Sequence, residues 1–172
     1  MAGRRLRNAR RPGVTVLPAP ANVNADWDVP VSVRDGTVLR VNVFRPRTDD
    51  PVPVILCAHP YGKDGIPARR RGVNAQYRAF PQPHPIRFSE WTGWEAPDPA
   101  TWTDRGYAVI NADLRGAGTS DGVGELFSTQ ESQDYHDLIE WAGTQPWSTG
   151  RVGLLGVSYL AISQYGAAAT RP

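Results

Sequence analysis

A serine near the carboxyl end of the sequence lies between a short apolar strand pattern and a helical pattern. Residues 153–161 read Gly-Leu-Leu-Gly-Val-Ser-Tyr-Leu-Ala. A serine in a sharp strand-to-helix turn is the nucleophile elbow of serine hydrolases, in which the turn lifts the hydroxyl clear of the sheet. Serine is also a common N-cap residue at a helix start. The nonapeptide alone leaves both interpretations of Ser158 open.

Acyl transfer at a serine also needs hydrogen-bond donors for the oxyanion of the tetrahedral intermediate. The amide of Tyr159 is the natural first donor, because the first N–H groups of a helix have no acceptor within the helix. A second donor is expected from the loop 59–65, which follows an apolar strand and contains Tyr61. For Tyr61 alone, a surface aromatic beside a proline turn is the alternative.

A base that accepts the serine proton is harder to find. The three histidines are His59, at a strand end where it would position a loop, His84, in a Pro-rich loop, and His136, on the expected exposed side of a helix. In α/β hydrolases the chain order is serine, then acid, then histidine. Residues 159–172 contain no His, Asp or Glu. The catalytic set is therefore expected to be incomplete in this chain.

The elements that would position these residues follow from hydrophobic patterning. Residues 29–33 and 38–44 alternate apolar with polar around an Asp35-Gly36 turn, which predicts a β-hairpin with one buried face. Three runs that are apolar on both faces predict buried parallel strands: 52–58, 107–112 and 152–155. The order of elements is typical of an α/β doubly wound protein, with Ser158 where the fifth strand meets its helix.

Helix signals separate these strands. Asp98-Pro99 is an N-cap and N1 pair that predicts a short helix closed at Gly106. Ser128 and Glu131 have capping-box spacing, and an amphipathic helix is expected after them, with its apolar face formed by Tyr135, Leu138, Ile139 and Ala142. A further helix is expected directly after Ser158.

Charge divides the chain into two parts. Five of the 19 basic residues are arginines within the first eleven positions, which leaves 19 − 5 = 14 basic against 17 acidic residues in the body. Residues 1–25 are predicted to be a basic, disordered leader, with contact to an anionic partner as the less favoured alternative. Residues 26–172 are predicted to form the catalytic domain. The mildly acidic body argues against nucleic-acid binding.

Composition also limits the expected cellular location and the expected cofactors. No stretch approaches the roughly 20 apolar residues of a membrane span, and Cys57, the single cysteine, is expected to be a buried thiol. These features fit a cytoplasmic protein without cofactor or metal.

The Gly116-Ala117-Gly118 run departs from a dinucleotide fingerprint in its spacing, so a structural turn is favoured. The long segment 66–95 is either a functional rim, with Trp91 and Trp94 lining an acyl pocket, or a packed or disordered loop.

An ordered set of motifs resembles one enzyme family. It is similar to the CocE/NonD family, the cocaine-esterase-like and X-Pro dipeptidyl-peptidase (S15) α/β hydrolases, over about residues 26–172. The motifs that carry the resemblance are Arg-Asp-Gly at 34–36, Phe-Arg-Pro at 44–46, Pro-Tyr-Gly-Lys-Asp at 60–64, Glu-Ala-Pro-Asp-Pro at 95–99, Arg-Gly-Tyr-Ala-Val at 105–109, Asp-Leu-Arg-Gly-Ala-Gly-Thr-Ser at 113–120, Gln-Pro-Trp at 145–147 and Gly-Val-Ser-Tyr-Leu at 156–160.

The resemblance implies the N-terminal portion of an α/β-hydrolase fold: a β-hairpin followed by parallel strands with flanking helices. It implies Ser158 as nucleophile, with the Tyr61 hydroxyl and the Tyr159 amide as oxyanion hole. The implied reaction is hydrolysis of a small-molecule ester or an acyl-peptide bond, X-Pro bonds included, through an acyl-Ser158 intermediate. Some full-length relatives are expected to be oligomeric.

Two departures from the family pattern stand out. Ala161 replaces a common glycine, and Leu160 stands where hydrolases of amino-acid esters carry an acid. The family's triad Asp and His, its helical cap and its C-terminal β-sandwich come after the nucleophile helix. The alternative is therefore a catalytically incompetent fragment that lacks the triad Asp and His.

Overall fold

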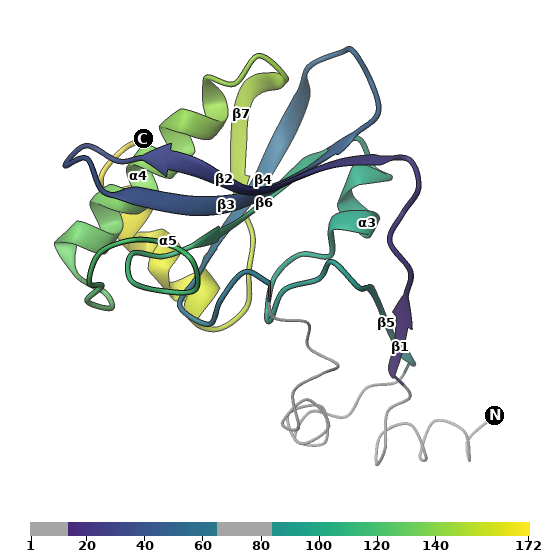
Figure 1. Ribbon diagram of the computed structural model, residues 1–172, viewed down its shortest axis with the longest axis horizontal. Helices are drawn as coiled ribbons and strands as arrows, with labels where there is room; N and C mark the ends of the chain where they lie inside the picture. The colour runs from purple at the N-terminus through teal and green to yellow at the C-terminus, as the bar shows by residue number, and fades with distance from the viewer. Residues whose placement is uncertain (1–13, 65–83) are drawn as a thin grey trace.

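A five-stranded mixed sheet forms the centre of the protein (Figure 1). The computed structural model describes residues 14–64 and 84–172. The hairpin strands and their neighbour are antiparallel, whereas β6, β4 and β7 are mutually parallel. The strands lie in the order β2 (Val23–Ser32), β3 (Val38–Pro46), β6 (Ala108–Asp113), β4 (Val52–His59) and β7 (Ser148–Leu154).

The predicted hairpin is confirmed as β2 and β3. Gly36 takes a φ of 85°, which the tight turn requires and which glycine adopts without strain. The Val33 amide donates to the Thr37 carbonyl at 3.0 Å across that turn. β2 is longer than predicted and contains an irregularity between Asp26 and Val29. Asp28, which lies within this irregularity, contacts Lys63 in the loop after β4.

The central strands β4 and β6 are confirmed as the buried pair. All six residues of β6 are buried, and β4 is buried from Val54 to His59. The predicted third buried strand is only partly correct, because β7 has no fully buried residue and pairs with β4 alone among the described strands. An edge strand has one neighbour, so its side chains are less covered than the apolar run 152–155 suggested.

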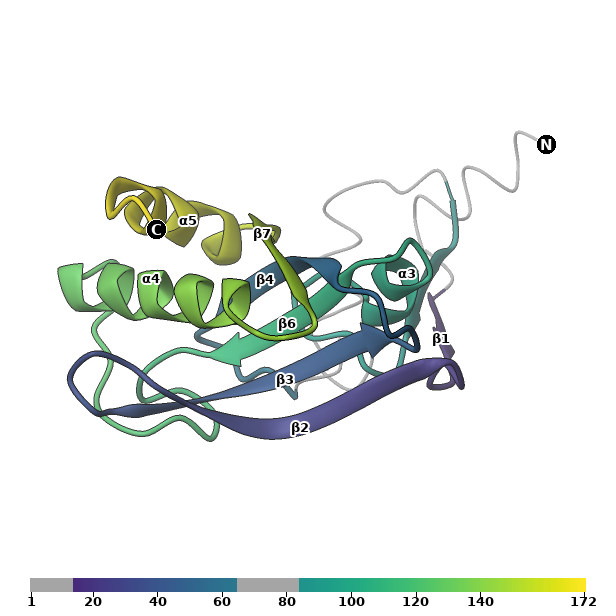
Figure 2. The same ribbon diagram turned by 90° about the horizontal axis from the view of Figure 1, so that it is seen from above.

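Helices pack on both faces of the sheet. Figure 2 shows α4 (Thr129–Gly143) and α5 (Tyr159–Ala169) side by side on one face. Tyr135 and Leu138 of α4 are fully buried there in the main hydrophobic core. On the other face a smaller cluster forms around Phe44 and Val109, and the short helix α3 (Pro99–Thr103) contributes Trp102 to it. The doubly wound α/β prediction is confirmed.

The leader prediction is wrong for residues 14–25. β1 (Val14–Leu17) pairs in parallel with β5 (Ile86–Ser89), and β2 already begins at Val23. The Ala19 amide also donates to Glu90 Oε1 at 2.9 Å. These segments gain order from partners far away in the chain, which local composition does not reveal. Residues 1–13 lie outside the described part, and the proposed boundary at residue 25 stays a prediction.

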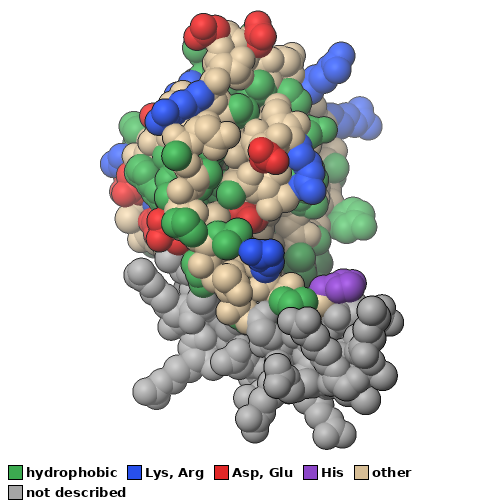
Figure 3. Space-filling model, turned by 90° about the vertical axis from the view of Figure 1, so that its right-hand side faces the viewer, with side chains coloured by type: hydrophobic (Ala, Val, Ile, Leu, Met, Phe, Trp, Pro, Cys, Tyr) green, Lys and Arg blue, Asp and Glu red, His purple; other side chains and the backbone are tan. Residues whose placement is uncertain are grey.

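The surface carries charges of both signs. Figure 3 shows acidic and basic side chains interspersed with hydrophobic ones on one face of the molecule. None of the helices formed by residues 14–64 and 84–172 has the length and apolar character needed to cross a membrane.

Candidate active site

Ser158 lies at the junction between β7 and α5. Its backbone has φ 57° and ψ −120°, a left-handed conformation that is uncommon for a residue with a side chain. The residue is exposed, and its side chain makes no capping hydrogen bond to the helix. The N-cap alternative for Ser158 therefore does not explain its conformation. The strained strand-to-helix turn with an exposed hydroxyl matches the geometry of a nucleophile elbow.

Close packing at Gly156 and two backbone hydrogen bonds hold this turn in place. A Cβ atom added at Gly156 would lie 2.4 Å from the Leu160 Cβ, so the chain can reverse this tightly only with glycine there. The Val157 amide donates to the Glu95 carbonyl at 3.1 Å, and the Leu155 amide donates to the Leu56 carbonyl at 3.3 Å. A backbone in this region costs about 1–3 kcal/mol, and these two hydrogen bonds hold the strand side of it.

The two predicted oxyanion donors lie beside the elbow. Tyr61 is in the loop after β4, and its ring centroid is 6.3 Å from that of Tyr159. Tyr159 is the first residue of α5, so its N–H has no acceptor within the helix. Burial, together with the charge of Glu95, raises the pKa of Tyr61. The phenol therefore stays protonated at neutral pH and is able to donate a hydrogen bond.

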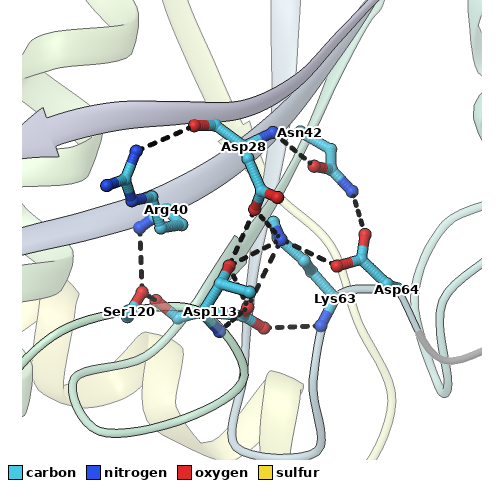
Figure 4. A network of polar contacts seen from close by, with 8 residues as sticks. Asp28, Arg40, Asn42, Lys63, Asp64, Asp113 and Ser120 are labelled. Atoms are coloured by element: carbon cyan, nitrogen blue, oxygen red, sulfur yellow. Dashed lines mark hydrogen bonds and ion pairs between the residues drawn. The ribbon is translucent and has the colours of Figure 1, made fainter.

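A polar network holds the loop that carries Tyr61 (Figure 4). The side chain of Lys63 is completely buried, and its Nζ donates to Asp28 at 2.5 Å, to Asp64 at 2.8 Å and to Thr119 at 3.0 Å. Burial alone lowers the pKa of Lys63, but the hydrogen bonds to Asp28 and Asp64 and the charge of Asp113 reverse the effect, so the pKa is raised. The ammonium remains charged and joins three segments at the carboxyl ends of the strands.

Asp113, at the end of β6, is the buried hydrogen-bond acceptor of this network. Its carboxylate accepts the Lys63 amide at 2.5 Å and the Thr119 amide at 2.9 Å, and it is fully buried. A Cβ atom at Gly118 would lie 2.0 Å from Asp113 Oδ2, so only glycine fits at this position. Gly118 thus packs directly against this carboxylate in the turn that presents the Thr119 amide to it, as the structural-turn interpretation expects.

Sequence patterning did not identify two further polar contacts. Arg115 binds Asp134 of α4 through two hydrogen bonds of 2.7 and 2.8 Å and contacts Asp35 of the hairpin turn at 2.9 Å. Glu131, expected as a capping-box residue, accepts a short hydrogen bond from the hydroxyl of Tyr159. Both contacts join residues from separate elements, and a local sequence pattern does not show such pairings.

The histidines occupy other positions. His59 is completely buried at the end of β4, with its Nε2 at 3.6 Å from the Cys57 thiol. His136 is half-buried rather than exposed, because its Nδ1 lies 2.9 Å from the Thr170 hydroxyl at the far end of α5 from Ser158. His84 is exposed before β5. The structure therefore does not favour any of them as the base for Ser158.

Two other predictions concern side chains away from the elbow. Cys57 is confirmed as a buried thiol, and burial raises its pKa. Trp91 stacks on the buried Phe44 with ring centroids 5.3 Å apart and packs against the smaller core cluster, and its place in an acyl pocket stays a prediction. The described residues contain no group of three or more His, Cys, Asp or Glu side chains suited to a metal ion.

Several known proteins are similar to this chain in sequence. The family model of X-Pro dipeptidyl-peptidase (S15 family) matches residues 35–172. Cocaine esterase from Rhodococcus sp. (strain MB1 Bresler) is 32% identical over 147 residues, which cover 86% of this chain and 21% of the esterase. Xaa-Pro dipeptidyl-peptidase from Streptococcus sanguinis is 26% identical, over 77% of this chain and 23% of that enzyme.

Solved structures show the same relationship. A CocE/NonD family hydrolase from Staphylococcus aureus superposes with a TM-score of 0.78 and 34% identity, over 95% of this chain and 32% of that one. The sheet order, the helices and the serine turn define an α/β-hydrolase fold over the region described. The chain belongs to the X-Pro dipeptidyl-peptidase (S15) family, among the CocE/NonD hydrolases. It spans only about a fifth to a third of the length of these relatives.

Proposed function

We propose that this chain supplies the nucleophile and the oxyanion hole of a serine hydrolase that cleaves an ester or an acyl-peptide bond. Ser158 is the nucleophile, and the Tyr159 amide and the Tyr61 hydroxyl are the oxyanion donors. The observation that carries the proposal is the left-handed backbone of Ser158, with its side chain unused as a cap, beside the Tyr61–Tyr159 pair. An X-Pro peptide and a simple ester are the two substrate classes that the relatives' names suggest.

The proposed reaction has two steps. The Ser158 oxygen attacks the carbonyl carbon of the substrate, its proton passes to a base, and the carbonyl oxygen becomes an oxyanion that accepts hydrogen bonds from Tyr159 and Tyr61. The oxyanion then collapses, the leaving group departs with a proton, and water hydrolyses the acyl-serine. Each donor is expected to contribute about 10²–10³ in rate, as in other oxyanion holes.

The second candidate concerns the competence of residues 1–172 alone. The sequence after Ser158 contains no His, Asp or Glu, and the three histidines are placed as described above. We propose that the base and its acid partner lie outside these residues, so that this chain alone does not turn over substrate. The two candidates are compatible, because one concerns the site and the other its completeness.

The test uses the protein expressed from its complete reading frame and, in parallel, residues 1–172. A fluorophosphonate probe should label the complete protein at Ser158, and a p-nitrophenyl ester should be hydrolysed with loss of both signals in Ser158→Ala. Tyr61→Phe should lower kcat about 10²-fold, as loss of an oxyanion donor does, whereas Tyr165→Phe, a matched change at a tyrosine that is 80% exposed, should not. Probe labelling that persists in Ser158→Ala would refute the assignment. Burst kinetics from residues 1–172 would refute the second candidate.

A further inference from the structure

We propose that Glu131 is a positioning residue that fixes Tyr159 and Phe127 around the elbow, in addition to its role at the start of α4. The inference rests on the proposed function for its catalytic meaning, but the contact itself is testable without activity. Glu131 is 8% exposed, and its Oε2 accepts hydrogen bonds from the Tyr159 hydroxyl and from the Phe127 amide, the latter at 3.3 Å. A single carboxylate oxygen thus holds two segments together.

The side chain of Glu131 does not act as in an ordinary capping box. In that motif the N3 carboxylate returns to the amide of the N-cap residue. Here the N-cap residue Ser128 forms its half of the capping box, because its Oγ accepts a hydrogen bond from the Glu131 amide at 3.1 Å. The Ser128 amide, however, donates to the Glu125 carbonyl at 3.4 Å. The carboxylate of Glu131 therefore reaches across to α5 instead of completing the cap of its own helix.

Phe127 is the second segment held by Glu131. Its backbone has φ 58°, and its side chain is 58% exposed although it is aromatic. Left-handed backbone in a bulky residue is strained and is frequent at functional sites. The ring centroids of Phe127 and Tyr159 are 4.6 Å apart. The Tyr61 ring packs edge-on against Tyr159, with the two centroids 6.3 Å apart. The three rings form a continuous aromatic group next to Ser158.

The position of Tyr159 explains why this anchoring matters. Its backbone N–H directly follows Ser158, and its side chain is fixed at the far end by Glu131 and on its ring by Phe127. A residue that is held at its hydroxyl and ring has little freedom to rotate its peptide group. Misplacement of a catalytic group by about 1 Å can lower a rate by about 10²-fold. Glu131 thus controls the direction of the amide that the proposed oxyanion uses, without touching substrate.

The test compares variants in the protein expressed from its complete reading frame. Glu131→Ala and Tyr159→Phe each remove the same hydrogen bond from opposite sides, and Tyr159→Phe leaves the backbone amide in place. Hydrogen–deuterium exchange of the peptide that covers residues 157–161 should become about 10- to 100-fold faster in both, the range expected for a lost hydrogen bond to a charged group. The double variant should exchange no faster than either single one. Glu131→Gln, which keeps an acceptor oxygen, should restore part of the protection.

Ser128→Ala is the matched control, because it removes the α4 cap and leaves the Glu131–Tyr159 contact. It should speed exchange in the first turn of α4 but not in residues 157–161. Equal acceleration of residues 157–161 by Ser128→Ala and Glu131→Ala would overturn the proposal, since Glu131 would then act only through α4. Unchanged exchange in Tyr159→Phe would overturn it as well, even if Glu131→Ala fails to fold. Both outcomes are independent of activity.

Kinetics separate this proposal from the proposed function. If Ser158 is the nucleophile, Glu131→Ala should lower kcat with little change in KM, as expected when a transition-state contact is misplaced. If the parent protein shows neither labelling nor turnover while exchange responds as predicted, the proposed function fails and the positioning contact stands. If kcat falls in Glu131→Ala without faster exchange at residues 157–161, the positioning role is wrong.

Discussion

Replacement of Lys63 is expected to be among the most damaging single changes outside the hydrophobic core. Lys63 is the only lysine in the sequence, and its side chain is completely buried among Asp28, Asp64 and Asp113. Lys63→Met preserves the length and the apolar stem of the side chain but removes the charge and its three donors. The variant therefore isolates the contribution of the ammonium group.

The magnitude follows from the exposure of the three carboxylates. Removing one partner of a buried ion pair costs about 3–5 kcal/mol, because the remaining charge stays buried without compensation. The side chains of Asp28 and Asp64 are each 52% exposed, so water can solvate them once Lys63 is lost. Asp113 is fully buried and keeps the amides of Lys63 and Thr119 and the Thr119 hydroxyl as donors, none of which carries a charge. The expected loss is at the lower end of the range, about 3 kcal/mol.

Lys63→Arg tests whether charge alone is sufficient. The compact ammonium directs three donors to three acceptors, whereas a guanidinium is planar and larger. We expect a loss of about 1–3 kcal/mol from overpacking, although the charge is kept. Asp64→Asn serves as a control at the exposed edge of the network and should cost less than about 1 kcal/mol.

Urea unfolding measures these differences, provided that the slope of the transition is unchanged between variants. Reaction with an amine-specific reagent adds a second measurement, because the only lysine should be modified in the unfolded protein and protected in the folded one. A Lys63→Met variant within about 0.5 kcal/mol of the parent, the range of ordinary surface changes, would refute the reasoning. Rapid modification of Lys63 in the folded parent would refute its burial.

Two further predictions concern the elbow and acid stability. Ser158→Gly should be more stable than Ser158→Ala by about 1 kcal/mol, because glycine adopts this backbone without the strain that any side chain incurs. Equal thermal midpoints of the two variants would contradict a strained elbow. Hydrogen bonds from Lys63 and Thr119 lower the pKa of Asp28, and Arg115 lowers the pKa of Asp35 to about 2. The stability from these carboxylates is present above their unfolded pKa near about 4 and is lost as pH falls through the lowered folded values. The thermal midpoint should therefore drop between about pH 4 and 2, and a flat profile there would be inconsistent with these contacts.

Much of the fold could be predicted because its signals are local. The Asp35-Gly36 turn, the Ser128 cap and the uniformly apolar β4 and β6 each need only neighbouring residues to be recognised. The pairing of β1 with β5 joins segments around residues 14 and 86 and has no local signature. The exposure of β7 depends on its having one neighbouring strand, which apolar content does not reveal.

The candidate site was predictable to a similar extent. Ser158, Tyr61 and Tyr159 could be selected from residue type and from their places after strands, and the structure brings the two tyrosines together. Their roles in catalysis stay predictions. The contacts of Lys63 and Glu131 were not predicted, because each looks ordinary in the sequence, as a polar loop residue and as a helix-cap residue. Their importance arises only when acceptors or donors from other segments converge on them.

The protein itself provides the comparison that distinguishes a helix cap from an elbow. Asp98 and Ser128 are working N-caps: their backbones are extended, and their side chains accept hydrogen bonds from the amides of Ala100 and Glu131. Ser158 occupies the same position before α5 but has a left-handed backbone and caps nothing. A serine selected to begin a helix would be more stable in the conformation that the other two adopt. The strain of about 1–3 kcal/mol at Ser158 is therefore better explained by the need to expose its hydroxyl than by the needs of the fold.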